Sequence, residues 1–93
     1  SLKGEAYNQS LILLKSNKEV IKLIGTPIDV GFFVEGSIHT SIGGGETSIN
    51  YAISGPKGKA VVYLYAKRDM NKWRIKHMKV LDDKDVIKIV IVK

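Results

Sequence analysis

The chain has 93 residues, of which 44% are hydrophobic and 26% charged, a composition that fits one globular domain and excludes a disordered chain. It contains no cysteine, which excludes a disulfide framework and thiolate chemistry. Residues 1–56 contain 4 Lys and 5 acidic residues, whereas residues 57–93 contain 11 Lys or Arg and 4 acidic residues. The two parts therefore carry charges of −1 and +7, and the basic part favours an acidic partner.

An amphipathic helix is predicted near the start of the chain. Tyr7, Leu11 and Leu14 recur at the i, i+4, i+7 spacing of one helical face, and Ile12 lies beside them. We expect these side chains to be buried.

A second, shorter helix is predicted to begin at Ser16, whose hydroxyl can cap a backbone N–H while Glu19 reaches back to the cap. It should end at Gly25, because glycine readily adopts the left-handed conformation and Pro27 cannot continue a helix. The side chains expected on its buried face are Val20, Ile21, Leu23 and Ile24.

After Pro27 the hydrophobic period changes from 3.6 to 2, which predicts strands to the end of the chain. Residues 32–40 alternate, Gly43–Gly45 should reverse the chain, and Gly55–Gly58 should close a second hairpin. The return strand between these turns carries its expected inward side chains at Ile49, Tyr51 and Ile53.

The segment Ala60–Ala66 is apolar on both faces, so we expect a central strand covered by helix on at least one side. A turn at Asp69–Asn71 should lead into a strand containing Trp73, and a turn at Asp82–Asp85 into an edge strand over 86–92. The sequence therefore predicts a single α+β domain over residues 1–93. An N-terminal helix or helix pair should pack on an antiparallel or mixed sheet of about five to six strands.

No motif indicates a catalytic, cofactor or metal site. Gly43–Gly45 is followed by a strand, and Gly55–Lys59 lacks the spacing and the hydroxyl residue of a phosphate-binding loop. His39 and His77 have no second ligand at a metal-like spacing. The acidic residues near the end, Asp82, Asp83 and Asp85, lack the calcium-loop pattern and fit turn and capping positions. We therefore expect no enzyme activity, cofactor or metal.

Two segments resemble the cytochrome c oxidase assembly factor one family. They are Leu23–Ile28 (LIGTPI) and Ser54–Ala60 (SGPKGKA), which occur in the order and at the spacing that the family shows. Further matching positions over nearly the whole chain are Lys3–Tyr7, Glu19–Lys22, Gly31, Gly36–Ile38 and Trp73.

The resemblance implies a fold similar to the intermembrane-space domain of the twenty-one-kilodalton subunit of the mitochondrial inner-membrane translocase. It also implies a transmembrane helix before Ser1, an extracytoplasmic location for the domain, and a role in respiratory-complex assembly through protein contacts. No catalytic residue is carried over from the family.

From the charge division and the resemblance, we expect a membrane-tethered, non-enzymatic domain that docks an acidic or membrane-embedded protein partner. The candidate partner-binding residues are Lys57, Lys59, Arg68, Lys72, Arg74 and Lys76.

Two alternatives stay open. A basic sheet could bind single-stranded nucleic acid or another anionic polymer, because Tyr63, Tyr65 and Trp73 are interleaved with basic residues. Against this, strand alternation places Trp73 and Arg74 on opposite faces. A small enzyme or ligand carrier would require a deep apolar cavity between helix and sheet that converges on His39 or His77.

Overall fold

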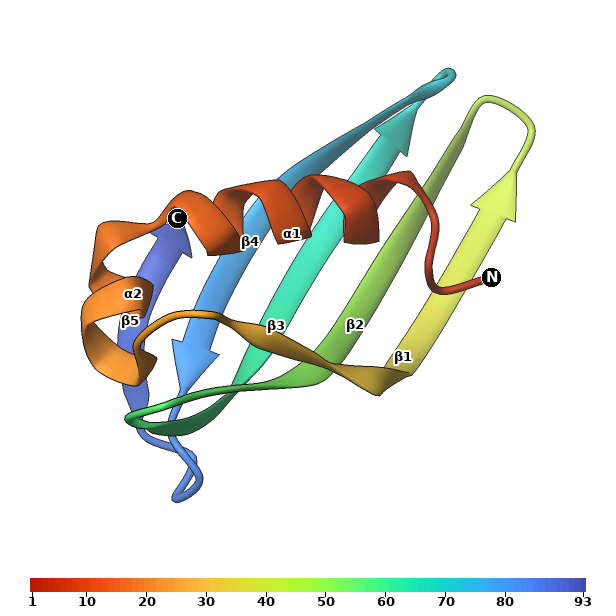
Figure 1. Ribbon diagram of the computed structural model, residues 1–93. Helices are drawn as coiled ribbons and strands as arrows, with labels where there is room; N and C mark the ends of the chain where they lie inside the picture. The colour runs from red at the N-terminus through yellow and green to blue at the C-terminus, as the bar shows by residue number, and fades with distance from the viewer.

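The computed structural model describes residues 1–93 as two helices followed by five strands (Figure 1). The strands form one antiparallel sheet in the order β1-β2-β3-β4-β5, which confirms the α+β prediction and settles the sheet as wholly antiparallel. The elements are α1 Glu5–Ser16, α2 Lys18–Ile24, β1 Asp29–Ser41, β2 Gly44–Gly55, β3 Gly58–Asp69, β4 Lys72–Leu81 and β5 Ile87–Val92.

Both helices pack on the same face of the sheet, with α1 crossing the strands and contacting β4, and α2 contacting β3 (Figure 1). The core lies between them and that face. Each inner strand contributes alternate residues to it, as the period-2 pattern predicted. The strand residues in this core are Ile49, Tyr51, Ile53, Ala60, Val62, Leu64, Ala66, Met78, Val80 and Ile89. The opposite face of the sheet is covered by no helix or strand of the chain.

Helix α1 is fastened to the sheet by a buried hydrogen-bonded chain. Ser10 Oγ donates to the carbonyl oxygen of Tyr7 at 2.6 Å, and the Tyr51 hydroxyl lies 2.8 Å from Ser10 Oγ. The ring of Tyr51 also meets that of Tyr7 edge-on, with centroids 5.3 Å apart. Helical periodicity of the apolar residues gave no sign of Ser10, because its burial depends on Tyr51 from a distant strand.

The apolar face of α1 was predicted correctly at Tyr7 and Leu14, which are buried, and at Leu11, which is half-buried against the core. The prediction for Ile12 was wrong: 72% of its side chain is exposed. One residue turns a helix by about 100°, so a residue adjacent to the buried stripe points past the sheet and into solvent.

Helix α2 begins one residue later than predicted. Asn17 is its N-cap, and Asn17 Oδ1 accepts a hydrogen bond from the Val20 N–H at 3.0 Å. Ser16 instead ends α1, where its hydroxyl donates to the carbonyl oxygen of Ile12. The helix ends before Gly25 as predicted, with φ of 79° at that glycine. Val20 and Ile24 are buried, Ile21 is half-buried, and Leu23 is exposed.

The C-terminus of α2 meets the turn between β2 and β3. The carbonyl oxygen of Ile24 accepts a hydrogen bond from the Lys57 N–H at 2.8 Å. A Cβ atom on Gly55 would lie only 2.3 Å from that same oxygen, so the contact requires a glycine. The two segments on which the family resemblance was based therefore touch in space, and together they fix the end of α2 on the sheet.

Bulges or irregularities modify the simple alternation in three of the four strand pairings. The β1–β2 register shifts between Val30 and Val34, and both Phe32 and Phe33 are exposed, although strict alternation would bury one of them. A second shift separates Tyr65 from Ala66 in the β3–β4 pairing. Shifts along β4–β5 leave Ile87 exposed while Ile89 is buried.

The predicted turns are confirmed with one adjustment. The first reversal is made by Ile42 and Gly43, and Gly44 and Gly45 already belong to β2. In the last turn, the Asp82 carboxylate accepts hydrogen bonds from the N–H groups of Val86 and Lys84, which hold the pKa of Asp82 below its usual value. This is the capping role predicted for that residue.

Neither helix is long and apolar enough to cross a membrane.

The substitution Tyr51→Phe should lower the free energy of unfolding by about 0.5 to 1.5 kcal/mol at neutral pH, because it removes the hydrogen bond to Ser10. Ser10 keeps its bond to the Tyr7 carbonyl, so no buried donor is left unpaired. Urea denaturation would measure the loss. Tyr63→Phe is the matched control, because Tyr63 lies on the uncovered face, and equal losses in both variants would contradict this account.

The deficit of the Tyr51→Phe variant should shrink at alkaline pH. Burial raises the pKa of Tyr51 from 10.0 to about 12, so the contribution of Tyr51 to stability is fully present below the unfolded pKa. That contribution is lost as the pH rises through the folded pKa, because the unfolded chain ionises first. Urea midpoints compared between neutral pH and about pH 11 would show convergence of the two proteins. A constant gap would contradict the burial of an unionised hydroxyl.

The substitution Gly55→Ala should destabilise the protein by about 1 to 3 kcal/mol, because its methyl group would collide with the Ile24 carbonyl oxygen. Thermal unfolding would measure this loss. Gly44→Ala is a suitable control, since its added methyl group would meet the Arg68 carbonyl oxygen at an ordinary contact distance of 3.4 Å. A Gly55→Ala variant as stable as the control would show that α2 is not held by this turn.

Candidate functional site

The uncovered face of the sheet presents polar, aromatic and basic side chains in rows that cross the strands. One row consists of Ser37, Ser48, Tyr65 and His77. The next row towards the β1–β2 turn consists of His39, Glu46, Lys67 and Arg74, and the next in the other direction of Glu35, Asn50, Tyr63 and Lys79. We call this surface, defined by these three rows, the open face.

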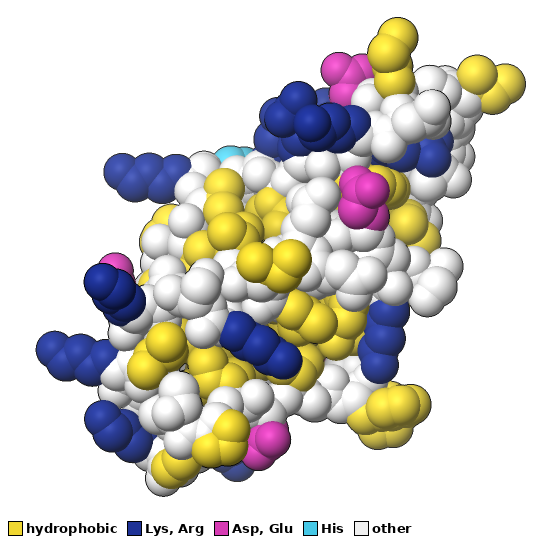
Figure 2. Space-filling view, turned by 45° about the horizontal axis from the view of Figure 1, so that its top comes forward, with side chains coloured by type: hydrophobic (Ala, Val, Ile, Leu, Met, Phe, Trp, Pro, Cys, Tyr) yellow, Lys and Arg dark blue, Asp and Glu magenta, His cyan; other side chains and the backbone are white.

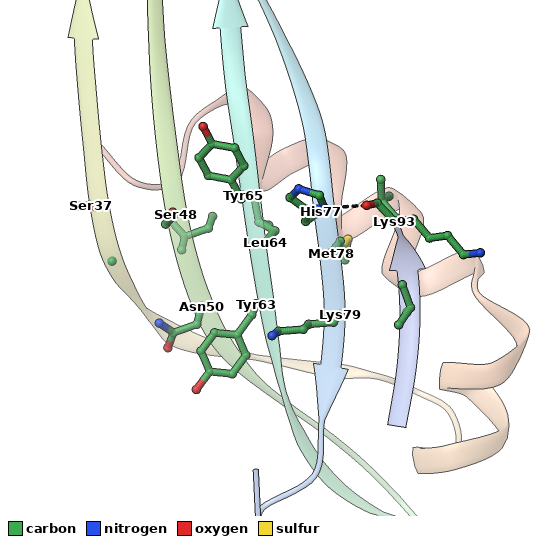
Figure 3. A pocket seen from close by; sticks show the side chains of 14 residues that line it. Ser37, Ser48, Asn50, Tyr63, Leu64, Tyr65, His77, Met78, Lys79 and Lys93 are labelled. Atoms are coloured by element: carbon green, nitrogen blue, oxygen red, sulfur yellow. Dashed lines mark hydrogen bonds between the residues drawn. The ribbon is translucent and has the colours of Figure 1, made fainter. Parts of the chain in front are cut away.

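The open face is hollowed into a groove of about 610 Å³ that extends from β1 to β5. Figure 3 shows Tyr63, Tyr65 and His77 from neighbouring strands along this groove, with Lys79 beside Tyr63. The cavity considered from the sequence lay between helix and sheet, whereas this groove lies on the opposite face and is bounded by strands alone. His77 lines it and His39 does not.

Tyr65 is the centre of a connected set of side chains on the open face. Its hydroxyl donates to Glu46 Oε2 at 2.9 Å, and this hydrogen bond raises the pKa of Tyr65. Its ring stacks on His77, with centroids 6.1 Å apart and planes 23° apart. His77 Nδ1 donates in turn to the main-chain oxygen of Lys93 at 2.7 Å, a bond drawn in Figure 3. These contacts orient the two rings without burying them.

The structure does not bring the six predicted partner-binding residues together. Lys72, Arg74 and Lys76 lie on the part of β4 that extends past β5. Lys57 and Lys59 lie at the other end of the sheet, and Arg68 follows Lys59 by nine positions along β3, a length of roughly 30 Å. The three residues of β4 therefore form one basic cluster, and the two lysines near the β2–β3 turn are far from it.

Two of the six cations are bonded to the protein's own backbone. Arg68 Nη2 donates to the carbonyl oxygens of Ser41 and Gly44, both at 2.8 Å. Lys57 Nζ lies 3.4 Å from the carbonyl oxygen of Lys22, at the end of α2. Both side chains therefore contribute to holding turns in place.

The sequence-based set omitted two basic residues of the open face, Lys67 and Lys79. Lys67 pairs with Arg74 across β3 and β4, and Lys79 pairs with Tyr63. Lys67 follows Tyr63 and Tyr65 at alternate positions of β3, so strand alternation could have placed it on the same face as these tyrosines. Lys79 alternates in the same way with His77 along β4, but the face that β4 presents there depends on a bulge that the sequence did not predict.

Trp73 lies on the other side of the sheet from Arg74 and packs against the core, as alternation predicted. Both of its backbone hydrogen-bonding groups are satisfied by α1: Glu5 Oε2 accepts from the Trp73 N–H, and Gln9 Nε2 donates to the Trp73 carbonyl oxygen. These contacts protect the edge of β4 where β5 no longer pairs with it. Trp73 is therefore a structural residue.

The structure gathers no group of three or more His, Asp or Glu side chains that could hold a metal ion.

Comparison with known proteins gives one match. Residues 1–91 match the family model described as cytochrome oxidase complex assembly protein 1. No curated protein and no solved structure matches the chain. The family match extends from the residues before α1 to β5 and includes both of the segments that meet at the end of α2. The chain therefore belongs to the cytochrome oxidase complex assembly protein 1 family.

Proposed function

We propose that this domain is a non-enzymatic assembly factor that binds an acidic protein partner of cytochrome oxidase assembly through its open face. The observation that carries the proposal is the open face itself, because it is an organised surface that no part of the chain covers. Membership of the family supports the oxidase-assembly role.

The charge of the open face supports an acidic partner. Lys67 and Arg74 are paired across neighbouring strands, and Lys76 and Lys79 follow along β4. The acidic residues in this part of the face are Glu46 and Asp69, and the Glu46 carboxylate is engaged with the Tyr65 hydroxyl. The remaining basic side chains are available to pair with acidic groups of a partner, which would speed association and fix its orientation.

The aromatic residues of the groove support a role in contacting a protein more than a role in catalysis. The Tyr65 hydroxyl donates a hydrogen bond to Glu46, which raises the pKa of Tyr65, so at neutral pH the hydroxyl is protonated and is a poor nucleophile. Tyrosine combines a large apolar ring with a hydrogen-bonding tip, which suits protein interfaces. Tyr63 and Tyr65 would supply the apolar contacts, and the surrounding cations the polar rim.

Single-stranded nucleic acid is the second candidate, because Tyr63 and Tyr65 share the open face with Lys67 and Lys79. The position of Glu46 argues against it, since a carboxylate hydrogen-bonded to Tyr65 would repel a phosphate next to a base stacked there. An oligonucleotide that displaced the protein partner from the domain would favour this candidate.

Reversing the β4 cluster with Lys72→Glu, Arg74→Glu and Lys76→Glu should weaken capture of oxidase subunits at least about tenfold, because each substitution replaces an attraction with a repulsion. The full-length protein, solubilised in detergent, would be isolated and the associated oxidase subunits quantified by mass spectrometry. Capture by the unmodified protein should also fall as salt rises from roughly 50 to 300 mM.

The matched control is Lys57→Glu, Lys59→Glu and Lys84→Glu, which changes the net charge equally at the other end of the sheet. This variant should retain most of its capture. Equal loss in both variants would indicate an effect of net charge alone, and salt-independent capture would overturn electrostatic docking.

We further propose that the domain is tethered to a membrane by a segment preceding Ser1 and lies on the extracytoplasmic side, as the family resemblance suggests. The full-length protein should then stay in the membrane fraction after a high-salt wash and be digested by protease added outside intact membranes. Release by salt would contradict the tether, and protection from the protease would contradict the location.

A further inference from the structure

Two exposed apolar side chains stand at neighbouring hairpin tips. Ile42, in the β1–β2 turn, is fully exposed, and Met70, in the β3–β4 turn, is 75% exposed. In Figure 1 these two turns project together past the end of α1. Figure 2 shows hydrophobic side chains standing out at this end of the molecule, with a group of basic side chains just below them.

The two tips are fixed to one another. The Met70 N–H donates to the carbonyl oxygen of Gly43 at 2.8 Å, which joins the β3–β4 turn to the β1–β2 turn. Arg68 reinforces the junction, because one nitrogen of its guanidinium group bonds to carbonyl oxygens on both sides of the β1–β2 turn. Ile42 and Met70 are therefore presented side by side by a braced structure.

The backbone conformation at position 70 gives no reason for a methionine there. Its φ of 59° lies in the left-handed region, where glycine or asparagine is favoured and a long side chain is disfavoured. A methionine at this position gains no burial in return, because most of its side chain is in solvent. The same reasoning applies to Ile42, whose turn conformation needs only the positive φ of Gly43.

Basic side chains surround the base of the tips. Lys67, Lys72 and Arg74 lie within four residues of Met70, and Lys76 follows along β4. The acidic residues in the same region are Asp69 and Glu46, and Glu46 is bonded to Tyr65. The end of the molecule therefore combines an apolar point with an excess of positive charge just behind it.

We propose that the two hairpin tips form a membrane-docking site, in which Ile42 and Met70 insert into an anionic lipid surface and the surrounding cations contact its headgroups. Apolar side chains partition into the boundary between headgroups and acyl chains, and each Lys or Arg near an anionic surface strengthens binding by about fivefold. The inference goes beyond the proposed partner binding, which uses the open face and would not require Ile42 or Met70.

An anionic bilayer is the occupant that fits both features. Two side chains at a convex point present too little apolar area for the core of a stable protein interface, which normally buries about 800 Å² on each partner. A fluid bilayer can surround a convex point, whereas a protein partner would need a matching pocket. The positive charge is complementary to acidic headgroups, so the surface should discriminate between anionic and neutral lipids.

The test is co-sedimentation of the 93-residue chain with vesicles of phosphatidylcholine alone and of phosphatidylcholine with phosphatidylglycerol. We expect binding to the anionic vesicles and at least about tenfold weaker binding to the neutral ones. The double variant Ile42→Ser with Met70→Asn should bind the anionic vesicles about tenfold more weakly while keeping every charge. Asparagine tolerates the φ of position 70, so this variant should fold at least as stably as the unmodified chain.

The matched control is Ile12→Ser with Phe33→Ser, which removes two similarly exposed apolar side chains, 72% and 79% exposed, away from the tips. It should bind as the unmodified chain does. A second measurement uses Ile42→Trp, whose added fluorescence should shift to the blue and be quenched by brominated lipid when the tip inserts.

Failure to bind anionic vesicles would overturn the proposal. Unchanged binding by the Ile42→Ser, Met70→Asn variant would overturn insertion, because charge alone would then explain the binding. If soluble polyglutamate bound the chain as tightly as the vesicles did, and equally well in the tip variant, the site would be one for acidic protein. Because the vesicles contain no protein and the proposed partner contact does not use Ile42 or Met70, failure of the vesicle tests would leave the proposed partner binding by the open face intact.

Discussion

The covering of only one sheet face by helix is the constraint on which the rest of this structure depends. Helix α1 has 12 residues and α2 has 7, and both are committed to the same side of a five-stranded sheet. Two hydrogen bonds between segments that are distant in the sequence hold them there: Tyr51–Ser10 under α1 and Ile24–Lys57 at the end of α2. Everything on the opposite face is consequently free to interact with another molecule.

That division explains the unequal chemistry of the two faces. In β3, for example, Val62 and Leu64 pack under the helices, whereas Tyr63 and Tyr65 on the intervening positions line an open groove. The sequence predicted a central position in the sheet for this strand, because it is apolar on both faces. The structure confirms that position. The aromatic character of its second face is not needed for the core, and it supports the view that this face contacts a partner.

Much of the fold could be predicted from the sequence because its signals are local. Gly25 ends α2, the Gly55–Gly58 turn joins two strands, and Ile49, Tyr51 and Ile53 alternate as expected. The errors arose where distant residues decide the outcome. Ser10 is buried because Tyr51 reaches it, and the register shift near Val30 and Val34 exposes two adjacent phenylalanines.

The site was less predictable than the fold for the same reason. A cluster of basic residues can be read from composition, but its division between two ends of the sheet follows from strand length and pairing. Lys59 and Arg68 are near in sequence and roughly 30 Å apart along β3. Arg68 also has a bracing role at the hairpin tips that no spacing rule would have suggested.

The most direct test of the central claim is site-specific photo-crosslinking in cells that produce the full-length protein. A photoreactive phenylalanine derivative would replace Tyr63 on the open face in one variant and Leu13 on α1 in another. We expect a crosslink to a cytochrome oxidase subunit or assembly intermediate from position 63 and none from position 13. Crosslinks to the oxidase only from position 13 would contradict it.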